Sequence, residues 1–161
     1  MKIFDASEVF QFAIRIEENG EKFYRYAEGI AKEEEEKKIF NYLADEETNH
    51  KKVFEHLVSK IEKYEPPESY PGEYFAYLRA YVDNIIFTKE ELDAELSRVK
   101  DTLSAVKFAI QRELDSILYF HETKKFISES QHHLIDKIIH EETKHFLKLS
   151  ELEKSYEKKG G

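Results

Sequence analysis

The feature that most constrains this chain of 161 residues is a Glu-x-x-His motif that occurs twice, as Glu47 with His50 and as Glu142 with His145. In an α-helix, residues three apart lie on one face about a turn from each other, so the carboxylate and the imidazole of one motif can bind the same metal ion. One such motif would be weak evidence, because Glu and His are common in helices. Two motifs, each preceded by a matching segment with another Glu, make a helical metal site the leading interpretation.

The segments before the motifs match each other, so the chain contains an internal repeat of two helix pairs. The sequence Ala-Ile-Arg-Ile-Glu ends at Glu17, and the similar sequence Ala-Ile-Gln-Arg-Glu ends at Glu113. The offset between the halves is 96 residues for Glu17 and Glu113 and 95 residues for Glu47 and Glu142. Each half therefore offers one Glu from its first helix and one Glu-x-x-His from its second.

All of these residues interrupt stripes of apolar residues that recur every three or four positions. The first stripe reads, in order, Phe10, Ala13, Glu17, Gly20, Tyr24 and Ala27. This spacing predicts amphipathic helices whose polar interruptions lie on the core face. An ionised carboxylate buried there without a partner is strongly unfavourable. Four such carboxylates cannot share a core unaided, whereas two divalent cations would cancel their charge.

This combination is the ligand set of di-iron and di-manganese bundles, which use a Glu from each of two helices and Glu-x-x-His from each of the other two. The candidate ligands are Glu17, Glu47, His50, Glu113, Glu142 and His145. A single core Glu is more often paired with Arg or Lys, and a single core His is more often only hydrogen-bonded. Six such residues in repeat register argue against coincidence. Carboxylate and imidazole ligands suit iron or manganese, and zinc is an alternative.

Two further residues are candidates to support the ligands. Tyr24 lies two turns beyond the first Glu on the same face, where it would either hydrogen-bond a ligand carboxylate or pack in the core. His121 lies eight residues after Glu113, near the level of the site, although an exposed histidine is the more common case. Glu46 and Glu141 turn away from the stripes, so we expect them on the surface or behind a ligand.

Composition favours long helices over a sandwich or a barrel, since the chain has only 5 Gly and 3 Pro. We expect an all-α fold, with residues 1–161 in a single domain. One helix pair would span about residues 5–64 and the other about 104–157. The acidic run 33–36 suits a solvated first helical turn. The connection over about 65–103 is too long for a tight turn and suits a crossover along a bundle.

The crossover itself divides into three parts. It begins with an irregular stretch marked by Pro66, Pro67, Pro71 and Gly72. The aromatic stretch 74–81 is expected to be helical, and residues 74–87 would either line a pocket or, as is more common, pack the crossover onto the bundle. Thr88 and Glu91 then form a capping-box pattern, which opens a short helix ending near Arg98.

Charge and cysteine content exclude several classes of function. The net charge of −9 argues against nucleic acid or an anionic membrane as a partner. The absence of Cys excludes disulfides, thiolate catalysis and iron–sulfur clusters, so any metal must be bound by oxygen and nitrogen. No segment has the pattern of a signal peptide or the length of a membrane span, so we expect a cytoplasmic protein.

Together the motifs resemble the rubrerythrin-like branch of the ferritin-like superfamily. The resemblance rests on Ala13-Ile14-x-x-Glu17-x-x-Gly20-x-x-Phe23-Tyr24, Leu43-Ala44-Asp45-Glu46-Glu47-x-x-His50, Glu113-x-Asp115-Ser116-Ile117 and Glu141-Glu142-x-x-His145. It implies a ferritin-like four-helix bundle that binds two iron ions. By this resemblance Glu47 and Glu142 would bridge the two ions. Glu17 and Glu113 would be terminal ligands, and His50 and His145 would complete the two coordination sets.

The resemblance also implies an activity, that of a non-haem di-iron oxidoreductase that reduces hydrogen peroxide or dioxygen, and a homodimer. Rubrerythrins carry a rubredoxin domain whose four Cys hold an electron-transfer iron. This chain has no Cys and would take electrons from a separate protein such as a rubredoxin. Rubrerythrins also have an extra Glu three residues after the third-helix ligand, where this chain has Ser116. The alternatives are therefore a ferroxidase or iron-handling protein and a non-redox bundle that binds zinc or manganese.

Overall fold

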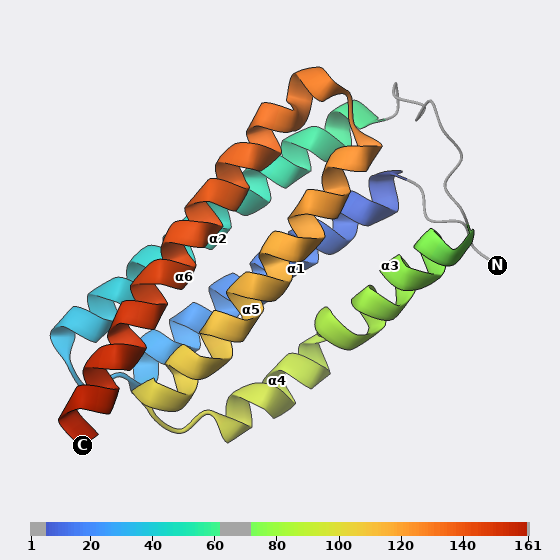
Figure 1. The fold of residues 1–161 in the computed structure, drawn as a ribbon. Helices are drawn as coiled ribbons and strands as arrows, with labels where there is room; N and C mark the ends of the chain where they lie inside the picture. Colours follow the sequence, from blue (N-terminus) through green and yellow to red (C-terminus); the bar gives the residue numbers. More distant parts are fainter. Residues whose placement is uncertain (1–5, 62–71, 161) are drawn as a thin grey trace.

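The computed structural model describes residues 6–61 and 72–160. Within these residues, four long helices lie side by side as a bundle (Figure 1): α1 (Ala6–Ile30), α2 (Glu34–Ile61), α5 (Thr102–Thr123) and α6 (His132–Gly160). Two shorter helices, α3 (Gly72–Ile85) and α4 (Lys89–Arg98), follow one another along the outside of the bundle. Two short 3-10 helices, Lys124–Phe126 and Glu129–Gln131, join α5 to α6.

The direction of the chain shows why so long a crossover is needed. The connections from α1 to α2 and from α5 to α6 are short, so each of these pairs is antiparallel. The helices α3 and α4 carry the chain back from the end of α2 to the start of α5, which leaves α2 and α5 parallel (Figure 1). The predicted all-α bundle with a long crossover between its second and third helices is confirmed.

Local sequence signals set the helix starts. The capping box predicted for α4 is confirmed: the Thr88 side chain accepts from the N–H of Glu91, and Glu91 Oε2 accepts from the N–H of Thr88 at 2.7 Å. Asp101 caps α5 in the same way with Ser104, so α5 begins slightly before the expected position near residue 104. The end of α6, at Gly160, lies beyond the expected end near residue 157. The expected helix start near residue 5 and the Pro-containing stretch 66–71 lie outside the described residues.

The acidic run 33–36 is not fully solvated, and the expectation for its last residue is wrong. Glu36 is only 6% exposed. Its Oε2 accepts a hydrogen bond from the Thr102 hydroxyl at 3.0 Å, and its Oε1 accepts one from the Tyr156 hydroxyl. Burial and this contact raise the pKa of Tyr156 to about 12. The carboxylate therefore ties the start of α2 to the start of α5 and the end of α6.

The core consists of two apolar layers with a polar layer between them. One layer packs the start of α1 and of α6 against the end of α2 and of α5, and includes Phe54 and Phe120. The other layer packs the opposite ends of the same helices, and includes Leu43 and Val106. Burying each of these large side chains contributes about 1.5–3 kcal/mol relative to leaving it in water. On every bundle helix the candidate ligands lie between the two layers, so the stripes read from the sequence are the faces that build the core.

The crossover packs its aromatic residues onto the bundle. The ring of Tyr81 stacks on that of Tyr119 with centroids 5.5 Å apart, and the ring of Phe87 stacks on that of Phe108 at 6.2 Å. The Asn19 side chain on α1 donates to the carbonyl oxygen of Phe87 at 3.1 Å. Of the two alternatives for residues 74–87, packing onto the bundle is thus confirmed for these rings.

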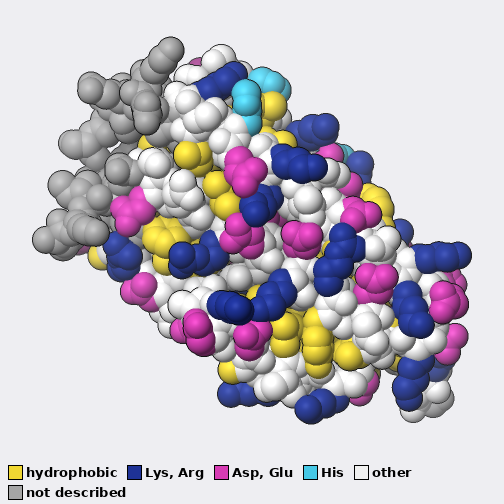
Figure 2. Space-filling view, turned by 180° about the vertical axis from the view of Figure 1, so that it is seen from behind, with side chains coloured by type: hydrophobic (Ala, Val, Ile, Leu, Met, Phe, Trp, Pro, Cys, Tyr) yellow, Lys and Arg dark blue, Asp and Glu magenta, His cyan; other side chains and the backbone are white. Residues whose placement is uncertain are grey.

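The surface mixes charges of both signs. On the face that Figure 2 shows, Lys and Arg side chains are interspersed with Asp and Glu, and hydrophobic side chains appear in separate groups. Within residues 6–61 and 72–160, no helix has the combination of length and apolarity that crossing a membrane requires.

Candidate metal centre

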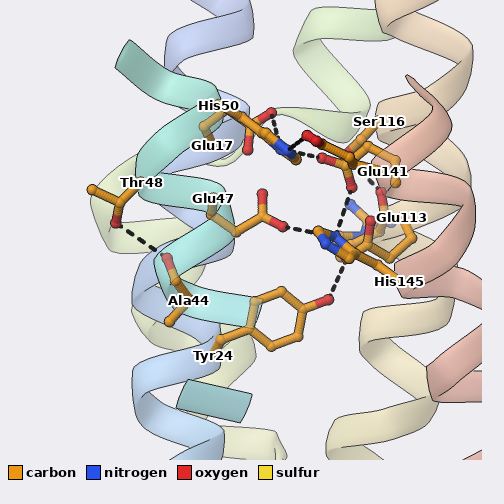
Figure 3. A network of polar contacts seen from close by, with 12 residues as sticks. Glu17, Tyr24, Ala44, Glu47, Thr48, His50, Glu113, Ser116, Glu141 and His145 are labelled. Carbon is orange, nitrogen blue, oxygen red and sulfur yellow. Dashed lines mark hydrogen bonds and ion pairs between the residues drawn. The ribbon is translucent and has the colours of Figure 1, made fainter. Parts of the chain in front are cut away.

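Six polar side chains from the four bundle helices meet in the layer between the two apolar layers, and Figure 3 labels five of them. Helix α1 contributes Glu17, helix α5 contributes Glu113, and helices α2 and α6 each contribute a Glu and a His. Each of the six residues is at most 4% exposed. The structure thus brings together all six residues that the sequence selected as candidate ligands.

The donor atoms form two overlapping groups of four. One group contains Glu17, Glu47, His50 and Glu142, and the other contains Glu47, Glu113, Glu142 and His145. Within each group, one donor atom from each residue lies within 4.8 Å of the others. Glu47 and Glu142 belong to both groups. A carboxylate has two oxygens, so a residue shared by two groups can bind one ion with each of them.

The two imidazoles lie at the two ends of the cluster. Nδ1 of His50 lies 2.8 Å from Glu142 Oε1 and 3.7 Å from Glu17 Oε1. Nδ1 of His145 lies 3.5 Å from Glu142 Oε2 and 3.6 Å from Glu47 Oε1. The rings are nearly parallel, and their centroids are 5.7 Å apart. The two oxygens of Glu142 therefore face different imidazoles, as a carboxylate between two ions would.

The cluster contains buried polar atoms that no other protein group satisfies. They are both oxygens of Glu17 and of Glu142, Oε1 of Glu47, Oε2 of Glu113 and Nδ1 of both histidines. The contact of His50 with Glu142 is close but lacks hydrogen-bond geometry. A buried polar group without a partner costs about 1–3 kcal/mol, and more when it is charged. Two cations would satisfy these oxygen and nitrogen atoms together, so the residues fit a two-metal centre.

Burial disfavours the negative charge of the carboxylates when no metal is bound. It raises the pKa of Glu17 and Glu47 well above the usual value, and together with the charge of Glu142 it raises the pKa of Glu113 to about 8. Burial and the charge of Glu47 raise the pKa of Glu142, but its close contacts with Glu113 and with the two imidazoles outweigh them and lower it. Burial lowers the pKa of His50, but contact with Glu142 overcomes it and raises the value to about 9. Metal ions would displace the protons that this cluster holds.

A glycine makes room for one of the shared carboxylates. A Cβ atom at Gly20 would lie 2.9 Å from Oε2 of Glu47 and 3.2 Å from its Cδ. Any larger residue at this position would therefore displace Glu47. Glycine inside a helix costs about 0.5–1 kcal/mol relative to alanine, so its presence in the middle of α1 is explained by the site rather than by the helix.

Tyr24, which the sequence selected as a supporting residue, is hydrogen-bonded to the cluster. Its buried hydroxyl donates to Oε1 of Glu113. Burial and the nearby carboxylates raise the pKa of Tyr24 well above its usual value, so the proton stays on the phenol. The hydrogen bond orients Glu113 and leaves Oε2 of this carboxylate to face the cluster.

Glu141, which the sequence placed on the surface or behind a ligand, holds one of the histidines. Its Oε2 lies 2.8 Å from Nε2 of His50. A carboxylate on one ring nitrogen fixes the orientation of the imidazole and directs the other nitrogen at the cluster. Nε2 of His145 has no hydrogen-bond partner within the described part of the chain. The two histidines are therefore held differently, which the repeat does not reveal.

Two other positions singled out from the sequence contribute no donor to the cluster. His121 is exposed in the last turn of α5 and belongs to none of the donor groups found among the described residues. Ser116 stands where the rubrerythrins described above have an extra Glu, and its hydroxyl donates to the carbonyl oxygen of Arg112 at 2.8 Å. The structure thus supplies no seventh ligand at this position.

Comparisons with known proteins agree with this geometry. A model of the rubrerythrin family matches residues 8–153, which include all six cluster residues. The chain belongs to the rubrerythrin family. Rubrerythrin-family membership and the buried carboxylate and histidine cluster together identify a candidate metal site built from these residues.

The fold of this rubrerythrin-family chain is also similar to a solved structure. The crystal structure of a ferritin-like diiron-carboxylate protein from Thermotoga maritima matches it with a TM-score of 0.74 and 31% sequence identity, over 96% of this chain and 97% of the other. A comparison with curated proteins found no significant match. The ferritin-like fold predicted from the sequence is confirmed.

Proposed function

We propose that this protein is a non-haem di-iron oxidoreductase that reduces hydrogen peroxide or dioxygen. The observation that supports this best is the pair of overlapping donor groups, which share Glu47 and Glu142 and contain buried donor atoms without protein partners. Carboxylate and imidazole ligands suit iron, and manganese or zinc are the alternative metals.

In this proposal the two carboxylates shared by both donor groups would help to hold both metal ions. Glu17 and His50 would complete the ligands of one ion, and Glu113 and His145 would complete those of the other. With iron bound, the centre would supply two electrons to the oxidant. The apolar layers on either side of the cluster exclude bulk water from these ligands.

Residues next to the ligands position them and hold protons. Glu141 lies 2.8 Å from Nε2 of His50 and would keep a proton on this nitrogen, so that Nδ1 could bind a metal ion after releasing the proton that the metal-free imidazole holds. Tyr24 keeps its own proton and donates it in a hydrogen bond to Oε1 of Glu113. Both contacts orient the ligand atoms toward the cluster.

The hydrogen bond of Ser116 supports a second candidate function, that of a ferroxidase or iron-handling protein. Because position 116 is a serine whose hydroxyl is bonded to Arg112 O, α5 adds no second carboxylate to the six repeat-related donors. Such a set is closer to the ferroxidase-type centres than to the rubrerythrin site described above. A non-redox bundle with zinc or manganese is the third candidate.

The proposal includes a separate source of electrons. These 161 residues contain no Cys to hold an electron-transfer iron, so the donor would lie outside them, and a rubredoxin is a candidate. A homodimer is expected from the family resemblance, and sedimentation velocity measures it directly.

The deciding experiment is metal analysis by mass spectrometry on protein expressed in iron-replete medium, followed by an absorption spectrum before and after peroxide. About two irons per chain, with oxo-bridged ferric absorption that rises on oxidation of the reduced protein, are expected. Two zinc or manganese ions with no response to peroxide would move the assignment to the non-redox bundle. Absence of metal under every loading condition would contradict the proposal.

The same preparation separates an oxidoreductase from an iron-handling protein. Ferrous iron added beyond the two ions of the centre should not be taken up, and the protein should remain a small oligomer. Uptake of many irons per chain, or assembly into a cage, would favour the iron-handling candidate instead.

A further inference from the structure

A cavity lies beside the candidate metal centre and is separate from the space between the donor atoms. It has a volume of about 40 Å³ and lies between α1, α5 and the junction of α3 with α4. Glu47, Glu113 and Tyr24 form part of its wall, so the cavity opens onto one side of the donor cluster. A single water molecule needs about 10–15 Å³ of such space, so the cavity has room for a small molecule.

The wall of the cavity away from the cluster is mostly apolar. Its apolar residues include Ile16, Phe23, Ile85, Phe87 and Phe108. They come from α1, from α5 and from the end of the aromatic crossover stretch, which therefore lines a cavity as well as packing on the bundle. Apolar cavities of this kind stay dry and bind apolar guests.

The polar side chains on this wall are already bonded to other protein groups. Asn19 donates to Phe87 O at 3.1 Å, and Ser116 donates to Arg112 O at 2.8 Å. Arg112 donates to the carbonyl oxygen of Ile85 at 3.2 Å and forms an ion pair with Asp115 at 2.7 Å. Its Nε has no hydrogen-bond partner among the described residues. A polar guest would lose its hydrogen bonds with water and find few protein groups here to replace them. An apolar guest has no such hydrogen bonds to lose.

The cavity also adjoins the surface. An open groove of about 490 Å³ lies against α1 and α4, and it shares Asn19, Phe87 and Leu92 with the cavity. These three side chains therefore separate solvent on one side from the space beside the ligands on the other. The groove thus adjoins the cavity through this shared wall, and the cavity in turn adjoins the cluster through Glu47 and Glu113.

We propose that this cavity is the binding place and the approach path of an apolar diatomic oxidant, dioxygen, to the side of the cluster formed by Glu47 and Glu113. The inference rests on the proposed function and selects dioxygen from the two oxidants that it names. Once Glu47 and Glu113 bind metal, the rest of the wall would leave the two O–H donors of hydrogen peroxide without acceptors, which disfavours peroxide in this cavity. Dioxygen has no hydrogen bonds to lose.

Xenon tests the cavity independently of any metal chemistry, because it is an apolar atom that occupies dry protein cavities. Crystals of the full chain under xenon pressure should show xenon between Ile16 and Phe108. Ile85→Trp should fill the cavity and abolish this xenon site. Leu118→Trp is the matched control, since it places the same ring at an exposed position of α5, where the native side chain is 49% exposed, and it should keep the site.

A second variant covers the case in which Ile85→Trp does not fold. Ile16→Ala removes apolar atoms from a part of the cavity wall that the surface groove does not share, and it should increase the xenon occupancy. Absence of xenon from the cavity in the native protein, or equal occupancy in the native protein and in folded Ile85→Trp, would overturn the inference.

Oxidation rates of the iron-loaded protein test the approach path. Ile85→Trp should slow oxidation by dioxygen about ten-fold and change oxidation by peroxide less than about two-fold, while Leu118→Trp should change neither. An unchanged dioxygen rate in Ile85→Trp, or an equal loss with both oxidants, would overturn the inference and leave the proposed function intact. A chain that binds no metal would contradict the proposed function, and the xenon experiment would still decide whether the cavity binds an apolar guest.

Discussion

At the scale of single residues, the two overlapping donor groups make the six ligands unequal. Glu47→Ala or Glu142→Ala removes a carboxylate that both groups share and should abolish metal binding at both positions. Glu17→Ala removes a donor from one group only and should leave about one metal per chain. Metal analysis after loading and desalting measures this, with circular dichroism as the check that each variant folds. Normal binding of two metals by Glu47→Ala or Glu142→Ala would show that these carboxylates do not bridge.

The two glycines inside α1 provide a second comparison between single residues. Gly29→Ala should raise the melting temperature by at most about 4 °C, because alanine favours a helix by at most about 1 kcal/mol, Gly29 lies in the last turn of α1, and a Cβ there meets no atom within 4 Å. Gly20→Ala gives the helix the same advantage but pushes on Glu47, so it should weaken metal binding at both positions. Calorimetry and metal titration separate the two effects. Unchanged metal affinity in Gly20→Ala would mean that Glu47 does not need the space that glycine leaves.

The residues that could be predicted from the sequence are those whose role follows from periodicity. The six ligands interrupt helical stripes in two repeats, so their spacing alone places them together. Glu141 could not be assigned in this way, because it turns off its stripe and its partner, His50, lies 91 residues away. His121 is a candidate only because it lies near the level of the ligands along the helix. It is exposed in the structure, so the level along a helix without the correct face does not identify a supporting residue.

At the scale of helices, the capping box of α4 controls a part of the fold that covers the cavity. Thr88→Ala removes the cap and should destabilise α4 by about 1 kcal/mol. Because α4 lies outside the bundle, the effect should be local: amide hydrogen exchange should speed up in residues 89–98 while the bundle helices stay protected. Asp101→Ala is the matched control, since it removes the equivalent cap from a bundle helix and should lower the melting temperature of the whole protein. Equal effects of the two variants on global stability would show that α4 does not unfold independently of the bundle.

The start of α2 contains a buried residue, Glu36, that helical periodicity does not predict. The acidic run 33–36 matches a solvated first turn, and three of its residues are exposed. Glu36 is buried because its partners, Thr102 and Tyr156, are brought to it by two other helices, 66 and 120 residues away. The period of a helix predicts which face is buried, but it does not predict which polar group a distant helix supplies.

At the scale of the whole molecule, the metal centre joins two helix pairs. The helices pack more extensively within the pair α1 and α2 and within the pair α5 and α6 than between the two pairs. Each pair supplies three of the six ligands, and each donor group takes ligands from both pairs. Metal bound at the cluster would therefore link the two halves of the internal repeat, in addition to satisfying the buried carboxylates.

Removal of metal should consequently lower the stability of the whole bundle. A ligand present at about 100 times its dissociation constant stabilises the folded state by about 2.7 kcal/mol, which for a chain of this size is a melting-temperature difference of about 5–10 °C. Calorimetry with and without a chelator measures the difference, and amide exchange should then increase in all four bundle helices. Glu47→Ala is the control, because a variant that binds no metal should melt at the same temperature with and without chelator. If the chelator leaves the melting temperature of the native protein unchanged although metal is removed, the bound ions do not hold the two helix pairs together, and packing between the apolar layers does so alone.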